Sequence, residues 1–299
     1  MSTPIFDSVT GAPLVIPSVD LEQKCNLTPR KSLIKTKKAS QEFVAHKNQC
    51  ESKSKESLAE ETPVAFVYNG ISHVVMMASP INLEDFALGF SITEEIVSSS
   101  SDFYSVEINH IKDGIELKIE ISSKCFMSLK ERRRNLTGRT GCGLCGAETL
   151  SQVVKYKDND FETSLTFGHD QIRYALDQFQ NNQELQKKTG AAHAVALYDN
   201  LGKILLIRED VGRHNAFDKV IGAAIKQEII NKHCFVITSS RASYEMIQKL
   251  SYINLSLIVA ISAPTALAVR LASKIGVTLI GFARADRYTI YSHKERIIE

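Results

Sequence analysis

Apolar and polar residues follow two different rhythms in the two halves of the chain. In the first half, residues 62–79 alternate on both sides of Asn69-Gly70, a dipeptide typical of tight hairpin turns. Residues 104–122 alternate in the same way around a second turn, Asp113-Gly114. Between them, apolar residues recur at helical spacing after Asn82, a residue that favours a helix start. The pattern therefore predicts two β-hairpins that form a small sheet with one helix on it.

The second half alternates between apolar strands and amphipathic helices. Strands are predicted over residues 191–199, 203–209, 234–240, 255–262 and 277–283. Helices are predicted over residues 169–182, 214–230, 241–250 and 263–276, the last one ended by Gly276. This alternation is typical of α/β domains, so we predict a mainly parallel sheet covered by helices on both faces.

Two stretches show neither rhythm. Residues 22–57 are rich in Lys, Ser and Gln, which is typical of a disordered, mildly basic extension, and we expect order to begin near Glu61. Residues 130–148 (KERRRNLTGRTGCGLCGAE) contain four glycines, which would lose too much entropy in a regular element, so a mobile loop is predicted. The predicted organisation has three parts: a disordered basic extension (1–57), a small hairpin-rich α+β domain (58–136) and a mobile C-x-x-C loop followed by an α/β domain (137–299).

Composition indicates the class of protein and the cellular compartment. Its 43% hydrophobic and 23% charged residues are ordinary for a soluble globular protein, and a formal charge of +2 is too small to indicate nucleic-acid binding. The start carries no basic leader or apolar run, so we expect no signal peptide. Residues 250–269 are uncharged but contain Asn254 and Pro264, which favours a buried strand and helix start over a membrane span. Six cysteines with one close pair are not a secreted disulfide framework, so we expect a reducing cytoplasm.

The close pair, Cys142 and Cys145, admits three chemical interpretations. A structural zinc site would need a second cysteine pair or suitably spaced histidines, and His193 lies 21 residues from His214. A thioredoxin-type dithiol normally opens a helix directly after a strand, whereas this pair follows a basic loop. The third interpretation, which the residues favour, is a persulfide carrier. Its glycines let the thiol reach two partners in turn, and the nearby arginines favour the thiolate.

Polar residues also gather where three predicted strands meet the next element. These segments are EDVGRHNAFDK (209–219), SSRASYE (239–245) and GFARADR (281–287). For the first, helix capping with a salt bridge is a competing explanation. We predict that the three turns share one edge of the sheet and form a single pocket for a phosphate-bearing ligand. Zinc deaminase chemistry is excluded, because neither His193 nor His214 is followed by the required glutamate and the C-x-x-C lies upstream of both.

With these motifs in view, the chain closely resembles the FdhD family of formate dehydrogenase accessory sulfurtransferases. The resemblance runs from about Glu61 to Ile290. It includes the stretches TPVAFVYNG, LEDFALGF, GRTGCGLCGAE, TGAAHAVAL, EDVGRHNAFDK, SSRASYEM, SAPTALAV and GFARADR. The chain departs from the usual pattern at Ala191 and Ala192 before the histidine, and at Thr289, where asparagine is common.

The resemblance implies a fold, an activity and a set of site residues. The fold would be α/β: a cytidine-deaminase-like three-layer C-terminal domain without zinc chemistry, beside a smaller β-rich α+β domain. The protein would be a cytoplasmic homodimer that takes sulfur from a cysteine desulfurase. Cys142 would be the persulfide carrier and Cys145 auxiliary. The residues that bind the guanine dinucleotide would be Phe282, Ala283, Arg284, Ala285, Asp286 and Arg287.

We therefore expect a sulfurtransferase. It would deliver sulfur to molybdenum bis(molybdopterin guanine dinucleotide), Mo-bis-MGD, before that cofactor enters formate dehydrogenase. No resident metal, nucleic acid or membrane is expected. The alternative is a cofactor-binding chaperone for formate dehydrogenase that transfers no sulfur. A dithiol oxidoreductase would instead need both cysteines equally and no nucleotide.

Overall fold

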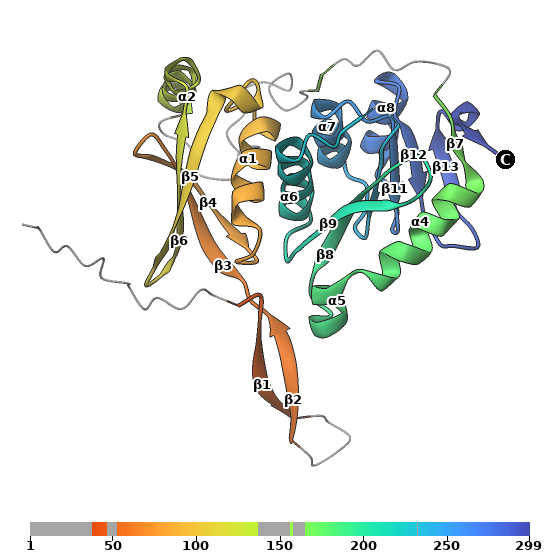
Figure 1. The fold of residues 1–299 in the computed structure, drawn as a ribbon, viewed down its shortest axis with the longest axis horizontal. Coiled ribbons are helices and arrows are strands. Elements are labelled where there is room, and N and C mark those ends of the chain that lie inside the picture. The colour runs from red at the N-terminus through yellow and green to blue at the C-terminus, as the bar shows by residue number, and fades with distance from the viewer. Residues whose placement is uncertain (1–37, 47–52, 137–155, 158–164, 232) are drawn as a thin grey trace, which may run out of the picture. The chain divides into compact units, whose positions relative to one another are not determined.

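The computed structural model describes residues 38–46, 53–136, 156–157, 165–231 and 233–299 (Figure 1). All of them belong to one compact unit, Thr36–Glu299. The first elements are β1 (Ser40–His46), β2 (Lys53–Ala59), β3 (Thr62–Tyr68), β4 (Ile71–Ala78), α1 (Leu83–Thr93), β5 (Phe103–Ile111), β6 (Gly114–Ile121) and α2 (Ser123–Leu136). A 3₁₀ turn, η1 (Ser100–Asp102), precedes β5. Among the described residues, no helix is both long enough and apolar enough to cross a membrane.

The later elements begin with β7 (Phe167–Gly168), α4 (His169–Asn181), α5 (Glu184–Thr189), β8 (His193–Tyr198), β9 (Ile204–Asp210), α6 (Arg213–Lys226) and β10 (Phe235–Thr238). They continue with α7 (Tyr244–Tyr252), β11 (Leu257–Ala260), α8 (Ala266–Lys274), β12 (Thr278–Gly281), β13 (Thr289–Ser292), η2 (Lys294–Arg296) and β14 (Ile297–Ile298). All four helices and all five strands predicted for this half are confirmed, and the structure adds β7, α5, β13, η2 and β14.

The small sheet forms as its alternation predicts. Its strand order is β4-β3-β6-β5, with two antiparallel hairpins joined by the parallel central pair β3–β6. Asn69 and Gly70 both take positive φ (44° and 80°), as a tight hairpin turn requires. Helix α1 covers the sheet, and the ring of Phe66 lies 5.0 Å from that of Phe86 and 4.5 Å from that of Phe90. Asn82 starts α1 through a left-handed backbone (φ 53°), but its side chain makes no capping hydrogen bond.

The large sheet is mixed, so the prediction of a mainly parallel sheet is wrong. Its order is β13-β12-β11-β10-β8-β9, in which β10, β11 and β12 run parallel and the other neighbouring pairs are antiparallel. The reason is that β8–β9 and β12–β13 are each joined by a short turn, which permits only antiparallel pairing. The predicted cover on both faces is confirmed: α6, α7 and α8 pack on one face and α4 on the other.

Two stretches predicted to be irregular contain regular structure. Strands β1 and β2 pair antiparallel within the stretch expected to be disordered up to residue 57, so described order begins before Glu61. Helix α2 includes residues 130–136, the first part of the predicted loop. Its cause is visible upstream, where Cys125 and Leu129, one helical turn apart, are buried in the core of the small sheet. The predicted domain boundaries at residues 58 and 137 remain predictions.

Helices α1 and α6 cross at two glycines and join the two sheets. A Cβ atom added to Gly89 would lie 1.8 Å from the carbonyl oxygen of Asp218. One added to Gly222 would lie 1.9 Å from the carbonyl oxygen of Asp85. Glycine is therefore the residue that lets the two backbones approach this closely, and Figure 1 shows the helices side by side.

Candidate functional site

The three polar turns predicted from the sequence lie at one edge of the large sheet. Strands β10, β11 and β12 run parallel, so their carboxyl ends share an edge. Strand β8 runs the other way, which places its first residue, His193, at that edge, opposite Asp210 at the end of β9. This edge is where ligands bind in α/β sheets. It is the candidate functional site.

The turn that contains Phe282–Arg287 is pinned to the end of the neighbouring strand β11. The backbone N–H of Phe282 donates to Ser262 O (3.1 Å), and that of Ala283 donates to Ala260 O (3.1 Å). Reciprocal backbone bonds between Arg284 and Arg287 (2.8 and 3.2 Å) then close a tip made of Ala285 and Asp286. Ala283 is buried, whereas Phe282 takes a left-handed backbone (φ 52°) and is half exposed. The tip therefore lies at the surface, while backbone hydrogen bonds hold the start of the turn in place.

The two arginines of this turn have different surroundings. Arg284 Nη1 donates to the carbonyl oxygens of Ile261 and Ala283 (both 2.7 Å), so its guanidinium braces the turn against the end of β11. Arg287 is exposed over 78% of its side chain and lies 3.6 Å from the Asp286 carboxylate. An exposed ion pair of this kind contributes little, about 0–1 kcal/mol, so Arg287 is free to meet a ligand.

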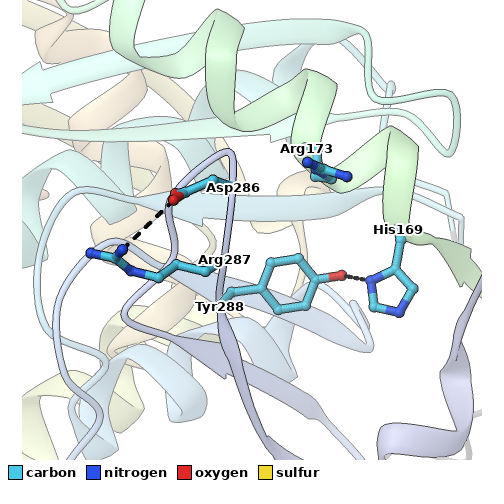
Figure 2. Close-up of a pocket in the computed structure, with 5 residues that line it drawn as sticks. All are labelled: His169, Arg173, Asp286, Arg287 and Tyr288. Atoms are coloured by element: carbon cyan, nitrogen blue, oxygen red, sulfur yellow. Dashed lines mark hydrogen bonds and ion pairs between the residues drawn. The ribbon is translucent and has the colours of Figure 1, made fainter.

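A pocket of about 230 Å³ lies between this turn and helix α4, as Figure 2 shows. Its lining residues are His169, Arg173, Asp286, Arg287 and Tyr288. The side chains of Asp286 and Arg287 extend to one side of the turn, and Tyr288 extends to the other side, toward His169. His169 and Arg173 were not predicted as site residues from the sequence, because they precede the turn by more than a hundred residues. The apolar pattern of α4 indicates which of its residues are buried, and it gives no information about the polar residues on its exposed face.

A second pocket, of about 380 Å³, opens at the same edge. Its lining residues are Gln183, Gln186, Gly190, Ala191, Ala192, His193 and Ser239. The turns around residues 239 and 282–287 line different pockets of these two. The three turns therefore do not share either of these two pockets. The reason is that β11 separates β10 from β12 in the sheet.

His193 is the titratable residue of the second pocket. Burial lowers its pKa, and the positive charge of Arg213 lowers it further. The imidazole is therefore neutral near pH 7. Ser239 Oγ accepts the backbone N–H of Ala194 (2.9 Å), which leaves its hydroxyl proton available to a ligand. None of the described residues that line this pocket has a charged side chain, so the lining suits a neutral polar group.

In the first of the three polar turns, EDVGRHNAFDK (209–219), the carboxylates of Glu209 and Asp210 have structural roles. Glu209 accepts the backbone N–H groups of Leu185 and Gln186 (both 2.8 Å) and so caps α5. Asp210 is fully buried and accepts from Lys219 Nζ (2.5 Å) and from the backbone N–H of Ser79 (3.0 Å). The competing explanation for this motif, capping with a salt bridge, is thus what the structure shows for these two residues.

The remaining polar residues of this motif have mixed surroundings. His214 Nε2 pairs with the Glu245 carboxylate, which lowers the pKa of that carboxyl group. Arg213 has a buried Nε without a hydrogen-bond partner among the described residues. Asn215 donates to Asp210 Oδ1 (3.0 Å) and to Met77 O (2.8 Å), so it adds to the buried network rather than to either pocket.

Cys142 and Cys145 lie outside the described residues. Of the cysteines that the structure describes, Cys125 and Cys234 are free and buried. Burial raises the pKa of the Cys234 thiol, which disfavours the reactive thiolate. No group of three or more His, Cys, Asp or Glu side chains in the described part of the chain is arranged to hold a metal ion.

Comparison with known proteins gives one consistent result. A model of the FdhD/NarQ family matches residues 59–298. A protein of Cupriavidus necator named sulfur carrier protein FdhD is 51% identical over 245 residues, which are 82% of this chain and 84% of that protein. A protein of the same name from Bordetella parapertussis is 48% identical over 240 residues, 80% of this chain and 87% of that protein.

A solved structure has the same fold. It is the crystal structure of a candidate formate dehydrogenase accessory protein from Desulfotalea psychrophila, which aligns with a TM-score of 0.68 at 22% identity. The alignment covers 87% of this chain and 98% of the other. Fold, motifs and relatives agree over the same residues, and the chain therefore belongs to the FdhD/NarQ family.

Proposed function

We propose that this protein is a sulfur carrier for the maturation of formate dehydrogenase. It accepts sulfur as a persulfide on Cys142 from a cysteine desulfurase. It then passes the sulfur to Mo-bis-MGD before that substrate is inserted into formate dehydrogenase. The observation that carries the proposal is the family match over residues 59–298, which includes the GRTGCGLCGAE loop. The name of the 51% identical relative, sulfur carrier protein, supports it.

The acceptance step is a thiol exchange. The Cys142 thiolate attacks the outer sulfur of the donor persulfide, the donor's S–S bond breaks, and the donor cysteine leaves as a thiolate. Cys142 then carries the sulfur as a persulfide, with no net oxidation or reduction. The arginines Arg132, Arg133, Arg134 and Arg139 precede Cys142 in the sequence, and positive charge favours the thiolate that this step requires.

Release of the sulfur as sulfide needs two electrons, and Cys145 supplies a route. Its thiolate attacks the inner sulfur of the Cys142 persulfide, a Cys142–Cys145 disulfide forms, and hydrosulfide leaves toward the molybdenum of the substrate. The two thiols are oxidised while the transferred sulfur is reduced, so the step balances. A cellular thiol reductant then restores both cysteines. This is the auxiliary role that we assign to Cys145.

The guanine dinucleotide is proposed to bind at Phe282–Arg287. The exposure of Phe282 and Arg287 at a firmly based turn supports this, as does the position of the turn at the ligand-binding edge of an α/β sheet. We also propose that the large sheet and its helices are a cytidine-deaminase-like domain. The working protein is proposed to be a cytoplasmic homodimer.

The test is intact-mass spectrometry after incubation with a cysteine desulfurase and cysteine. The parent chain should gain one sulfur atom, which a reductant removes. A Cys142→Ala variant should gain none and should fail to restore formate dehydrogenase activity in cells that lack the parent gene. Cys125→Ala is the matched control, because this buried thiol should be dispensable for sulfur acceptance. Cys145→Ala should still gain sulfur but release it more slowly.

The same variants separate the alternatives. Full formate dehydrogenase activity with Cys142→Ala would contradict the carrier role and favour the cofactor-binding chaperone. Equal and complete loss with either cysteine variant, without any gain of sulfur by the parent, would favour a dithiol oxidoreductase.

A further inference from the structure

We propose that the pocket between α4 and the β12–β13 turn is a diphosphate-binding site and that Arg173 is its principal anion donor. The inference rests on the proposed function, because the diphosphate belongs to the guanine dinucleotide of the sulfur acceptor. It adds residues from α4 to a site that the sequence assigned only to the turn. The pocket has room for a phosphate group, with a volume of about 230 Å³.

Three of the five residues that line the pocket can donate hydrogen bonds to a ligand. Arg173, Arg287 and His169 can donate to a ligand, whereas the Tyr288 hydroxyl is hydrogen-bonded to His169; Asp286 is the one acidic residue that lines the pocket among those the structure describes. Two guanidinium groups against one carboxylate give the lining a net positive charge. A phosphate needs this combination of positive charge and several convergent donors.

Arg173 is held ready for an anion. Its Nε donates to the carbonyl oxygen of Ala285 at 2.8 Å, which fixes the plane of the guanidinium beside the turn. Its two terminal nitrogens have no hydrogen-bond partner among the described residues. Such a fixed guanidinium loses little entropy on binding and can meet two phosphate oxygens at once.

Arg284 is a weaker candidate, although the motif includes it. Its Nη1 is committed to the carbonyl oxygens of Ile261 and Ala283, both at 2.7 Å. To bind a phosphate through this nitrogen, it would have to give up the brace that holds the turn. The geometry therefore gives Arg284 a positioning role and Arg173 a binding role.

Tyr288 and His169 form the far wall of the pocket. Their rings stack with centroids 5.5 Å apart, and the phenol oxygen is hydrogen-bonded to His169 Nδ1. Burial raises the pKa of Tyr288 to about 12, so the phenol stays protonated near pH 7 and brings no negative charge to the pocket. When His169 Nδ1 accepts the phenol proton, the ring proton is on Nε2, which can donate to a ligand.

Asp286 opposes anion binding. It holds the exposed Arg287 at 3.6 Å, and a phosphate would compete for the same guanidinium. Removing this carboxylate should therefore strengthen diphosphate binding, whereas removing Arg173 should weaken it. Opposite effects from two lining residues are a sharper test than a loss alone.

The experiment is calorimetric titration of the full chain with pyrophosphate, GDP, ADP and guanosine. Arg173→Ala should weaken pyrophosphate and GDP binding about tenfold. The affinity of Arg173→Lys for pyrophosphate and GDP should lie between those of Arg173→Ala and the parent. Lysine keeps the positive charge but lacks the guanidinium that can bind two oxygens at once. Asp286→Asn should tighten pyrophosphate binding. The matched control is Arg270→Ala, an exposed arginine on α8, which should leave all affinities unchanged.

Each other outcome has a definite meaning. Pyrophosphate affinity that is absent in the parent, or unchanged by both Arg173 variants, would overturn the proposal. If the Arg173 variants lose GDP and guanosine binding but bind pyrophosphate as the parent does, the pocket binds the guanine base and not the diphosphate. That result would also overturn the proposal. Sulfur acceptance by Cys142 needs no nucleotide and is measured by mass on the same variants. If the parent gains sulfur but the Arg173 variants bind pyrophosphate as the parent does, only the proposed diphosphate site is contradicted. If the parent gains no sulfur, the carrier role is contradicted.

Discussion

At the scale of single residues, the buried ion pair Lys219–Asp210 connects the large sheet to the small one. Both side chains are completely buried, with Nζ and Oδ2 2.5 Å apart. The same two groups also bond the backbone oxygen and nitrogen of Ser79, which follows β4 of the small sheet. Because one partner alone would be an uncompensated buried charge, each residue depends strongly on the other.

Replacing Lys219 with Met should therefore destabilise the protein by about 3–5 kcal/mol, since it leaves Asp210 charged and buried. The control is Lys226→Met, also on α6, where the exposed ion pair with Glu84 (2.5 Å) should contribute at most about 1 kcal/mol. Urea unfolding measures both changes. Equal losses in the two variants would contradict the importance of burial.

His193 links the second pocket to pH. Its pKa in the folded protein is lowered by burial and by Arg213, whereas the unfolded value is about 6.5. Below that pH the unfolded chain binds more protons than the folded one, so stability falls as the pH falls through this range. The loss between pH 7.5 and 5.5 should be smaller in His193→Gln. Urea unfolding at the two pH values gives the comparison, and an identical loss would mean that His193 is not a source of it.

At the scale of elements, the α1–α6 crossing makes an unusual prediction about glycine. Inside an ordinary helix, Gly→Ala stabilises by about 0.5–1 kcal/mol. At Gly222 the added methyl would meet the Asp85 carbonyl, so Gly222→Ala should destabilise by about 1–3 kcal/mol or more. A shift in the urea midpoint would show the sign. Stabilisation would mean that the two helices can separate without loss.

Sequence patterns predicted elements well where one segment determines its own structure. Both hairpins of the small sheet followed from Asn69-Gly70 and Asp113-Gly114, and α8 ends near Gly276 as expected. The position of β8 between β9 and β10 did not follow from any local pattern, because it depends on which strands become neighbours in the sheet. The short helix α5 was missed because its N-terminus is capped from a distance by Glu209.

The candidate site shows the same division between local and distant information. The turn at Phe282–Arg287 was visible as a polar strand end with two arginines. The partner that the structure adds, Arg173, lies on a helix whose pattern reported only its buried side. Which arginine faces the pocket and which braces the turn depends on contacts with Ala285 and Ile261, and no sequence spacing encodes these.

At the scale of the whole molecule, the two sheets should unfold together. The small sheet is joined to the large one by the α1–α6 crossing and by two buried ion-pair networks. One is the Lys219–Asp210 pair, and in the other Lys249 Nζ on α7 lies 2.8 Å from both the Asp218 carboxylate and the Thr93 hydroxyl at the end of α1. We therefore expect hydrogen exchange of β6 and β11 to require the same global opening and to respond alike to urea. Exchange of β6 at much lower denaturant would show that the small sheet opens by itself.

The crossing of α1 and α6 also has a consequence for synthesis of the protein. The ribosome makes α1 well before α6, and the contact between Ser79 and Asp210 joins residues 131 positions apart. Until α6 emerges, the nascent chain exposes the side of α1 that carries Gly89. A chain released during this interval should aggregate rather than fold as a half, so we expect the yield of folded protein to fall when translation stops between α1 and α6.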